Sequence, residues 1–493
     1  MEYELIAAVD LGSNSFRLQV ARVVGDQVYP LDTLKESVRL AAGLLPDKTL
    51  DVESQARGLA ALRQFGERLR GFDPQAVRAV ATNTLRVARN APQFLAAAEE
   101  ALGFPIDVIA GREEARLIYI GVAHSLPSSS ERRLVVDIGG GSTEFIIGKA
   151  FDPMLTESLY MGCVSYSLRY FPGGKVDKGR FVEAEIAAAR ELENIAHDYL
   201  AMGWDIAVGS SGTAREIEEI IEQNGFNPPR QSGITRQGID RLKAALIKAG
   251  SAERLGLAGM RSDRIPVLPG GLAILSAVFE FFELERMSYG DGALRLGVLY
   301  DLLGRFHHHD MRDATVEQFM RRYQVDVAQA RRVELHALEI FRRLAPETDQ
   351  ENVDAAMFLS WAARLHEIGI SVAHSAYHKH GAYILTFADM PGFSKKDQGR
   401  LALLVLGHRG KLEKINALAR DERDWLLVFS LRFAALFNRP RHGNRPALEV
   451  ARTPAGFRIR LPTGWLKKNA MTRGALEDEV RAWRSIGFDF EII

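Results

Sequence analysis

The first part of the chain alternates apolar and polar blocks in a pattern that predicts secondary structure. An apolar run at Leu5–Val9 precedes the polar segment Asp10–Ser15 and a second apolar-rich run at Phe16–Val24, which predicts two strands joined by a tight turn. From about 52 to 70, apolar residues recur at the spacing of a helix with one buried face. The same criteria predict strands at 77–81 and 106–109 and helices at 91–102 and 111–123. Residues 1–122 are therefore expected to form an α/β domain.

The opening pattern of apolar run, polar turn and apolar run returns once, around Asp137–Ser142. Aligning Asp10 with Asp137 also matches Gly12 to Gly139, at an offset of 127 residues. No shorter period recurs, which argues against a solenoid of stacked repeats. The single repeat predicts two related α/β domains with a cleft between them, the second spanning 123–305.

The pattern changes again in the C-terminal part of the chain. Helices are predicted at 178–201, 213–224, 236–249 and 270–283 in the second domain, and at 315–322, 326–344, 351–367, 395–408 and 421–437 beyond it. Because strand signals stop near 315, residues 306–438 are expected to form an all-α domain. The basic, turn-rich segment 438–446 then leads into strand, strand, helix and strand signals. These predict a small α/β module over 439–493.

Composition narrows the class of protein. The chain has 493 residues, is 47% hydrophobic and 26% charged, and so suits a globular protein with sizeable cores. A single cysteine, Cys163, excludes a disulfide framework within the chain and is expected to be a small buried residue. The longest uncharged apolar stretch, 265–279, falls short of the about 20 residues of a membrane span. We expect a cytoplasmic protein with no membrane span.

Charge is divided unevenly along a chain whose net charge is zero. Residues 306–493 contain 29 basic and 23 acidic side chains, and the first 305 residues contain 34 and 40. Ten of the 12 histidines also lie after residue 305. This excess favours contact between the C-terminal part and an anion, although a difference of this size is also ordinary scatter.

Three small-residue segments are suited to binding phosphate. Glycines in the turns Asp10–Ser15 and Asp137–Ser142 let backbone N–H groups approach an oxyanion, and serine hydroxyls add donors. The aspartate that opens each turn is suited to a divalent cation bridging phosphates. Gly209–Thr213, between a predicted strand and a helix, is either a third anion site or a helix cap.

These segments resemble the actin/Hsp70/hexokinase-like phosphotransfer fold, and more closely the exopolyphosphatase/guanosine-pentaphosphatase family. The motifs that carry the resemblance are Asp10–Ser15, Gly111–Arg116, Asp137–Glu144, Met161–Ser165, Asp291–Arg295 and Leu365–Gly369. The likeness extends over essentially the whole chain. It implies two actin-like (ribonuclease-H-like) α/β domains, a following HD-like helical domain and the small C-terminal module.

The resemblance also implies roles for individual residues. Glu114 would be the general base that activates water, although the sequence alone does not separate it from Glu113. Asp137 and Glu144, supported by Asp10, would bind Mg²⁺ or Mn²⁺, and K⁺ would act as an activator. Arg86 and Arg264 match basic positions near the phosphate path, and each is also compatible with an ordinary surface arginine. The other implied phosphate ligands are Gly12, Ser13, Asn14, Ser15, Gly139, Gly140, Gly141, Ser142, Gly209, Ser211, Gly212 and Thr213.

The helical domain resembles the metal-binding core of HD phosphohydrolases but has His366-Glu367 where that core has His-Asp. We therefore expect a degenerate scaffold that extends a substrate channel. His374, His378 and His380 are expected in a turn-rich stretch, and His307–His309 in a surface linker. The expected polyphosphate contacts, which solvated surface residues would equally explain, are His378, Lys379, His380, His408, Arg409, Lys411 and the arginines of 439–446.

Two activities follow from the family, and a third reading involves no turnover. Three successive glycines at 139–141 and the Asp291–Arg295 segment resemble the exopolyphosphatase branch, whereas the pentaphosphatase branch has alanine within that turn. Processive, metal-dependent release of phosphate from inorganic polyphosphate is thus the first expectation. The alternative is a guanosine pentaphosphate 5'-phosphohydrolase, and a non-catalytic polyphosphate or alarmone (pppGpp/ppGpp) binder is the third. A homodimer is implied, and no nucleic-acid partner.

Overall fold

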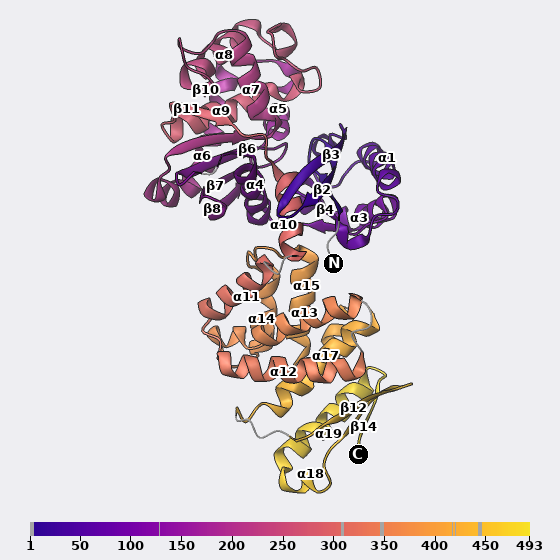
Figure 1. Cartoon of the computed structure of the whole chain (residues 1–493). Helices are drawn as coiled ribbons and strands as arrows, with labels where there is room; N and C mark the ends of the chain where they lie inside the picture. Colours follow the sequence, from indigo (N-terminus) through magenta and orange to yellow (C-terminus); the bar gives the residue numbers. More distant parts are fainter. Residues whose placement is uncertain are drawn as a thin grey trace. The chain divides into compact units, whose positions relative to one another are not determined.

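The computed structural model describes residues 4–127, 129–306, 310–345, 350–416, 418–419, 421–441 and 446–493. The chain divides into two compact units, Met1–Asp310 and Met311–Ile493 (Figure 1). The boundary predicted at 305/306 lies close to this division. The run His307–His309 lies outside the described residues, as do 442–445 of the basic linker, so their predicted roles stay predictions.

The first unit begins with a five-stranded sheet. Its order is β3 (Gln27–Glu36), β2 (Phe16–Val24), β1 (Leu5–Leu11), β4 (Val77–Ala81) and β5 (Ile106–Val108). The first three strands are antiparallel neighbours, and β4 and β5 extend the sheet in parallel from β1. Its other elements are η1 (Leu40–Gly43), α1 (Val52–Arg68), η2 (Pro74–Ala76), α2 (Asn83–Val87) and α3 (Ala91–Leu102).

A second sheet repeats this topology. Its order is β8 (Asp152–Leu159), β7 (Thr143–Lys149), β6 (Arg132–Ile138), β9 (Ile206–Ser210), β11 (Arg286–Tyr289) and β10 (Ile234–Thr235). Again three antiparallel strands are extended in parallel, here by β9 and β11. The helices are α4 (Gly111–Ser125), α5 (Cys163–Tyr170), η3 (Pro172–Gly174), α6 (Lys178–Met202), α7 (Ser211–Gln223), α8 (Arg236–Ala249), η4 (Ala252–Arg254), η5 (Ile265–Val267), α9 (Leu268–Phe281) and α10 (Leu294–Phe306).

Close packing of α4 against α10 fixes the helix that carries the predicted base. A Cβ on Gly297 of α10 would lie 1.7 Å from the Leu117 carbonyl oxygen, and one on Gly121 of α4 would lie 2.3 Å from the Ala293 oxygen. Only glycine allows the two backbones to approach so closely. The position of α4 relative to α10 is therefore fixed by these contacts.

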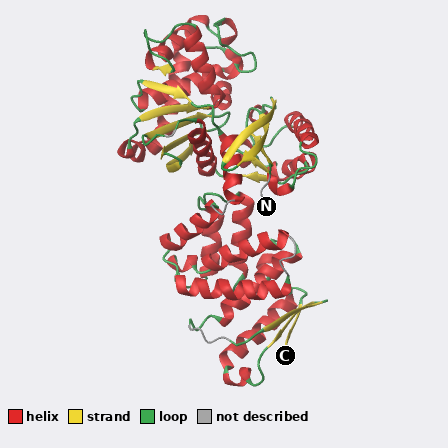
Figure 2. Ribbon diagram, in the orientation of Figure 1, coloured by secondary structure: helices red, strands yellow, loops and turns green. Residues whose placement is uncertain are grey.

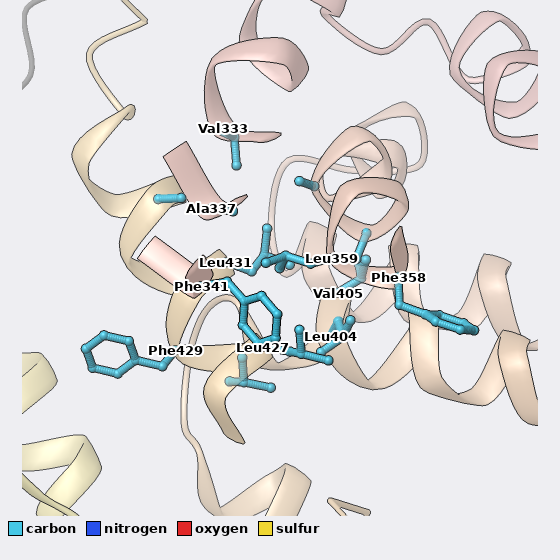
Figure 3. Close-up of a cluster of buried hydrophobic side chains, with 14 of the residues drawn as sticks. Val333, Ala337, Phe341, Phe358, Leu359, Leu404, Val405, Leu427, Phe429 and Leu431 are labelled. Atoms are coloured by element: carbon cyan, nitrogen blue, oxygen red, sulfur yellow. The ribbon is translucent and has the colours of Figure 1, made fainter. Parts of the chain in front are cut away.

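The second unit is mostly helical, and its described strands are confined to its C-terminal part (Figure 2). Its elements are α11 (Met311–Arg322), α12 (Val327–Leu344), α13 (Gln350–Leu365), η6 (Ile368–Ser371), α14 (Tyr377–Phe387), α15 (Lys395–Gly407), α16 (Glu413–Asn416), α17 (Glu422–Phe437), β12 (Glu449–Thr453), β13 (Gly456–Arg460), α18 (Trp465–Lys468), α19 (Ala470–Ser485) and β14 (Asp489–Ile492). Phe341, Leu404 and Leu427 gather in its core (Figure 3). The ring of Phe429 stacks on Phe457 of β13 at 4.1 Å, so helices and terminal sheet share one core.

One local expectation in this unit is wrong. The stretch containing His374, His378 and His380 was expected to be turn-rich, but α14 begins at Tyr377 and contains the last two. Gly381 lowers the helix propensity of this segment. It also allows close packing, because a Cβ there would lie 3.0 Å from Val405 of α15. Tertiary contact thus outweighs local preference.

Within the described ranges, no helix is both long and apolar enough to cross a membrane.

Candidate active site

A cleft of about 780 Å³ lies between the two sheets of the first unit, at the ends of their central strands. The predicted residues that line it are Asp10, Gly12, Ser13, Asn14, Ser15, Glu114, Asp137, Gly139, Gly140, Ser142, Glu144, Ser211, Gly212 and Arg264. Both polar turns and the third small-residue loop therefore meet in one place. The internal repeat accounts for this arrangement, because it puts equivalent turns at equivalent strand ends.

Three predicted metal-site carboxylates converge here from β1, β6 and β7. Asp10 and Asp137 lie near the ends of β1 and β6, and Glu144 is the direct cross-strand neighbour of Asp137. Burial raises the pKa of Asp137 to about 7, and it raises that of Glu144 well above the usual range with help from the Glu114 charge. Burial also raises the pKa of Asp10, whose Oδ1 has no hydrogen-bond partner. Carboxylates left in this state favour a bound cation.

The first turn of α4 separates the two adjacent glutamates. Glu114 lines the cleft, where Arg86 Nη1 donates a hydrogen bond of 2.7 Å to its Oε2. Glu113 points into a buried ion cluster instead, accepting hydrogen bonds of 2.7 and 2.8 Å from Arg116. Arg116 and Arg78 of this cluster both pair with Asp301 of α10. The geometry therefore places Glu114 at the cleft, a question that the sequence left open.

Burial controls the protonation of Glu114. It raises the pKa of this carboxyl, while the Arg86 charge and hydrogen bond lower it and Asp10 raises it further. Arg86 also donates to the Ile109 carbonyl oxygen at 3.0 Å, which orients its guanidinium. Although Arg86 does not line the cleft, it fixes the position of a carboxylate that does.

The two glycine turns face each other at close range. A Cβ on Gly140 would lie 3.0 Å from Ser13 Cβ, and one on Gly12 would lie 2.9 Å from the Ser15 carbonyl oxygen. Ser13 Oγ also accepts a hydrogen bond of 2.7 Å from Thr84. The turns form a narrow passage in which backbone N–H groups beside the glycines can reach an oxyanion.

The third loop is attached to the end of β6. Ser211 and Thr213 both donate to the Ile138 carbonyl oxygen at 3.0 Å. Arg264 donates to Thr213 Oγ1 at 2.8 Å and to Glu216 Oε2 at 3.0 Å, which holds its guanidinium at the wall of the cleft. Because Arg264 is only 7% exposed, the surface-arginine reading does not describe it.

Besides Arg86, three predicted phosphate ligands do not line the cleft. Gly209 lies within β9 against Ala214 and Met287, and Thr213 is occupied by the two hydrogen bonds just described. Gly141 packs on Asn83, since a Cβ there would lie 2.7 Å from its Oδ1. Local packing thus favours glycine at 141.

Sequence analysis missed two arginines of the cleft, Arg17 and Arg295. Arg295 Nη1 lies 3.9 Å from Asp10 Oδ2, and burial lowers its pKa to about 10, with Arg17 contributing. Arg17 is the cross-strand neighbour of Asp10, as Glu144 is of Asp137. The repeat offset of 127 aligns Arg17 with Glu144, so the signal was present in the sequence.

The carboxylates of the cleft suit a divalent cation that is also bound by substrate and water. Among the described residues, no three His, Cys, Asp or Glu side chains are close enough to hold an ion by themselves. Mg²⁺, however, is usually bound by one or two carboxylates, substrate phosphates and several waters. Asp137 and Glu144, together with the unpartnered Oδ1 of Asp10, supply such oxygen donors.

The predicted contacts in the second unit fall into two groups. His378 and His408 are buried, and burial lowers the pKa of His378 to about 4 and that of His408 well below its usual value. Lys379, Arg409 and Lys411 are exposed, and His380 is half-buried. Lys414 was not predicted from the sequence. Burial, with the positive charges of Arg432 and Lys379, lowers its pKa to about 8.

Paired glycine turns, buried carboxylates and arginines between two actin-like sheets define a hydrolase of phosphoanhydrides. The model of the Ppx/GppA phosphatase family matches residues 19–306, and that of Ppx/GppA phosphatase domain III matches 311–480. The chain belongs to the Ppx/GppA phosphatase family. The predicted fold class is thereby confirmed.

Curated relatives match the chain from end to end. A guanosine-5'-triphosphate,3'-diphosphate pyrophosphatase of Aeromonas hydrophila is 37% identical over 99% of this chain and 99% of its own length. One from Pseudoalteromonas translucida is 38% identical over 98% and 97%. An exopolyphosphatase structure from Cytophaga hutchinsonii is 24% identical, covers 61% of this chain and 98% of its own, and has a TM-score of 0.55. That likeness concerns the fold alone.

Proposed function

We propose that the protein hydrolyses the terminal 5'-phosphoanhydride of guanosine 5'-triphosphate 3'-diphosphate, releasing orthophosphate and guanosine 3',5'-bisdiphosphate. The observation that carries the proposal is the position of Glu114, held by Arg86 in a cleft walled by two phosphate-binding turns. The full-length relatives that share this architecture are named for that substrate. Hydrolysis of the guanosine pentaphosphate, the alternative in the sequence analysis, is therefore the first candidate, and hydrolysis of polyphosphate becomes the second.

The features that favoured polyphosphate have local explanations. Gly141, one of the three successive glycines, has a packing explanation, because a Cβ there would lie 2.7 Å from Asn83 Oδ1. Asp291 does not line the cleft, and its Oδ1 accepts a hydrogen bond of 3.0 Å from the Tyr289 hydroxyl. Neither residue therefore distinguishes the two substrates.

Glu114 acts in this scheme as the base for the attacking water. Its carboxylate orients the water and accepts a proton as the oxygen bonds to the terminal phosphorus, and the bond from that phosphorus to the bridging oxygen breaks. The raised pKa of Glu114 suits a group that must accept a proton. The N–H groups of both turns, with Arg17, Arg264 and Arg295, neutralise the charge on the phosphoryl oxygens.

Mg²⁺ held by Asp137 and Glu144, with Asp10 beside it, would supply further charge neutralisation. Mn²⁺ in its place, K⁺ as an activator, a homodimer and a cytoplasmic location stay predictions.

Inorganic polyphosphate is the second candidate substrate, and one observation favours it. The second unit contains a cluster of positive charges around Lys414 and His378. Besides burial, which is the larger cause, the charges of Arg432 and Lys379 lower the pKa of both groups, and Arg409 also lowers that of His378. A polyanion carrying about one charge per phosphate would bind such a cluster with strong salt dependence.

Phosphate release from both substrates, measured side by side with Mg²⁺ and K⁺, tests the proposal. Higher kcat/KM on the guanosine pentaphosphate is expected. Higher kcat/KM on polyphosphate would restore the exopolyphosphatase reading, and no release from either would favour a non-catalytic binder.

A further inference from the structure

A second cavity adjoins the phosphate cleft within the first unit and has no part in the chemistry described above. Its volume is about 840 Å³, counted with the open solvent at its mouth. Its walls are mainly apolar, with Val164, Leu168 and Phe171 on one side and Ile265 and Pro266 on another. Asn14 lines both this cavity and the cleft, so the two are contiguous.

Hydrogen bonds tie the walls of this cavity to the two phosphate-binding turns. The Arg39 and Ala41 N–H groups donate to the Asn14 and Ser13 carbonyl oxygens at 2.8 and 2.9 Å. On the other side, the Val164 N–H donates to the Gly140 oxygen at 3.0 Å. A ligand whose phosphates occupy the turns would therefore find this cavity at a fixed distance and orientation.

Two carboxylates face the cavity, and only one of them is engaged. Asp263 accepts a hydrogen bond of 2.7 Å from Lys35. Glu253 makes no hydrogen bond or ion pair with any residue that the structure describes. Its two oxygens lie at the Gly174 turn, each 3.3 Å from the position a Cβ would take. The two carboxylate oxygens of Glu253 are thus available to accept hydrogen bonds at the rim of an apolar pocket.

The chemistry of this pocket suits guanine. The guanine edge offers adjacent N1–H and N2–H donors, which a carboxylate accepts in a bidentate pair, whereas adenine has an acceptor at N1. Apolar walls would cover the faces of the ring. Arg39, which also lines the cavity and has no side-chain partner among the described residues, suits a second phosphate group outside the cleft.

We propose that this cavity binds the guanine base of a guanosine polyphosphate whose 5'-phosphates occupy the cleft, with Glu253 accepting from N1–H and N2–H and Arg39 contacting the 3'-diphosphate. The inference rests on the proposed function and gives it a basis for nucleotide selectivity.

The test compares kcat/KM for guanosine pentaphosphate, its adenosine counterpart and inorganic tripolyphosphate, which has no base and serves as the internal reference. Glu253→Gln should lower the ratio of kcat/KM for the guanosine to the adenosine substrate at least about tenfold. The amide would place an N–H donor against the N–H donors of guanine, so one hydrogen bond is lost. Ala42→Trp, which fills the pocket from its exposed rim, should raise KM for both nucleotides relative to tripolyphosphate. Glu193→Gln, an exposed site on α6, is the matched control.

Unchanged selectivity in Glu253→Gln, or unchanged nucleotide KM in Ala42→Trp, would overturn the base pocket while leaving the proposed hydrolysis intact. Equilibrium binding of guanosine pentaphosphate to the same proteins distinguishes failure of the proposed hydrolysis from failure of the base pocket. A wild type that binds the nucleotide but does not hydrolyse it would refute the proposed function alone, and the variants' Kd values would then decide on the pocket. A wild type that binds no guanosine pentaphosphate would refute both.

Discussion

The two halves of the cleft are built on the same strand–turn–strand unit but carry opposite charges. In the first, Asp10 lies across from Arg17, and in the second, Asp137 lies across from Glu144. The strand–turn–strand topology is alike and Gly12 aligns with Gly139, so the difference in charge opposite each aspartate comes from one aligned position, Arg17 against Glu144. The first half can therefore balance its aspartate internally, whereas the second concentrates two acids that need a cation from outside.

This asymmetry divides the work of binding a phosphate chain. In the proposed function the first half contacts phosphoryl oxygens through Arg17 and Arg295, which line the cleft and lower the pKa of Asp10 against the larger effect of burial. The second half is suited to a metal ion, because burial, with the charges of neighbouring carboxylates, raises the pKa of both Asp137 and Glu144 and a cation would offset this. One folding unit, used twice, thus yields two different subsites.

The largest expected effect concerns Glu114, which lies between the two halves. Glu114→Gln should lower kcat by about 10²–10⁴-fold, because the amide cannot accept the proton, while Kd changes little. Single-turnover rates and equilibrium binding of the same substrate check this. Normal turnover would remove Glu114 from the role of base.

Glu113→Gln is the contrasting variant. It leaves Arg116 and its partners buried with a deficit of negative charge, which costs about 3–5 kcal/mol of unfolding free energy. Denaturant unfolding should show a larger loss for Glu113→Gln, which leaves both Arg116 and Arg78 short of a partner charge, than for Glu114→Gln, which affects Arg86 alone.

The next largest effect compares the two aspartates. Asp137→Asn should lower kcat by about 10²–10³-fold and weaken the response to Mg²⁺, because several kcal/mol of charge stabilisation are lost. Asp10→Asn should cost less, since Arg295 and Arg17 offset its charge. Mg²⁺ titrations of both variants measure the contrast, and equal losses would show that the two halves share the metal equally.

Much of this arrangement was predictable because it depends on local patterns. The turns at Asp10 and Asp137 and the strands beside them follow from alternating apolar and polar blocks, and their meeting follows from the repeat. Which of Glu113 and Glu114 faces the cleft was not predictable from the helix alone, because consecutive helix residues point about 100° apart. The choice follows from tertiary contacts, in which Arg116 pairs with both Glu113 and Asp301. Arg17 was predictable in principle from the offset of 127.

Other features depend on contacts between distant segments. The second cavity is formed where η1, α5, η4 and η5 meet, and none of these segments carries a motif for a base. The glycines of α4 and α10 lower helix propensity locally, yet they are required by the approach of the two helices. Such positions become interpretable only when the packing partner is known.

A smaller effect is expected at Arg17, the residue that makes the halves unequal. Arg17→Ala should lower kcat/KM by about 10–100-fold, since a hydrogen bond to a charged group contributes about 1.5–3 kcal/mol. Arg17→Lys should restore part of this loss because it returns the charge without the planar geometry. Steady-state kinetics on tripolyphosphate, which has no base, isolate the phosphate contribution. If kcat/KM is unchanged in Arg17→Ala, the two halves of the cleft do not differ in function.

The smallest effect concerns the second unit and its use by a long polyanion. Lys414 is charged below its pKa of about 8 and becomes neutral above it, so polyphosphate binding should be stronger at pH 7 than at pH 9. A change in Kd of about fivefold is expected, equivalent to about 1 kcal/mol for one cation. Lys414→Gln should weaken binding at pH 7 and remove this part of the pH dependence, whereas Lys396→Gln, at an exposed site on α15, should not. The carboxylates proposed for catalysis lie in the other unit. If the pH dependence of polyphosphate Kd persists in Lys414→Gln, the titrating group belongs to the cleft. Lys414 and the positive charges around it would then have no measurable role in binding.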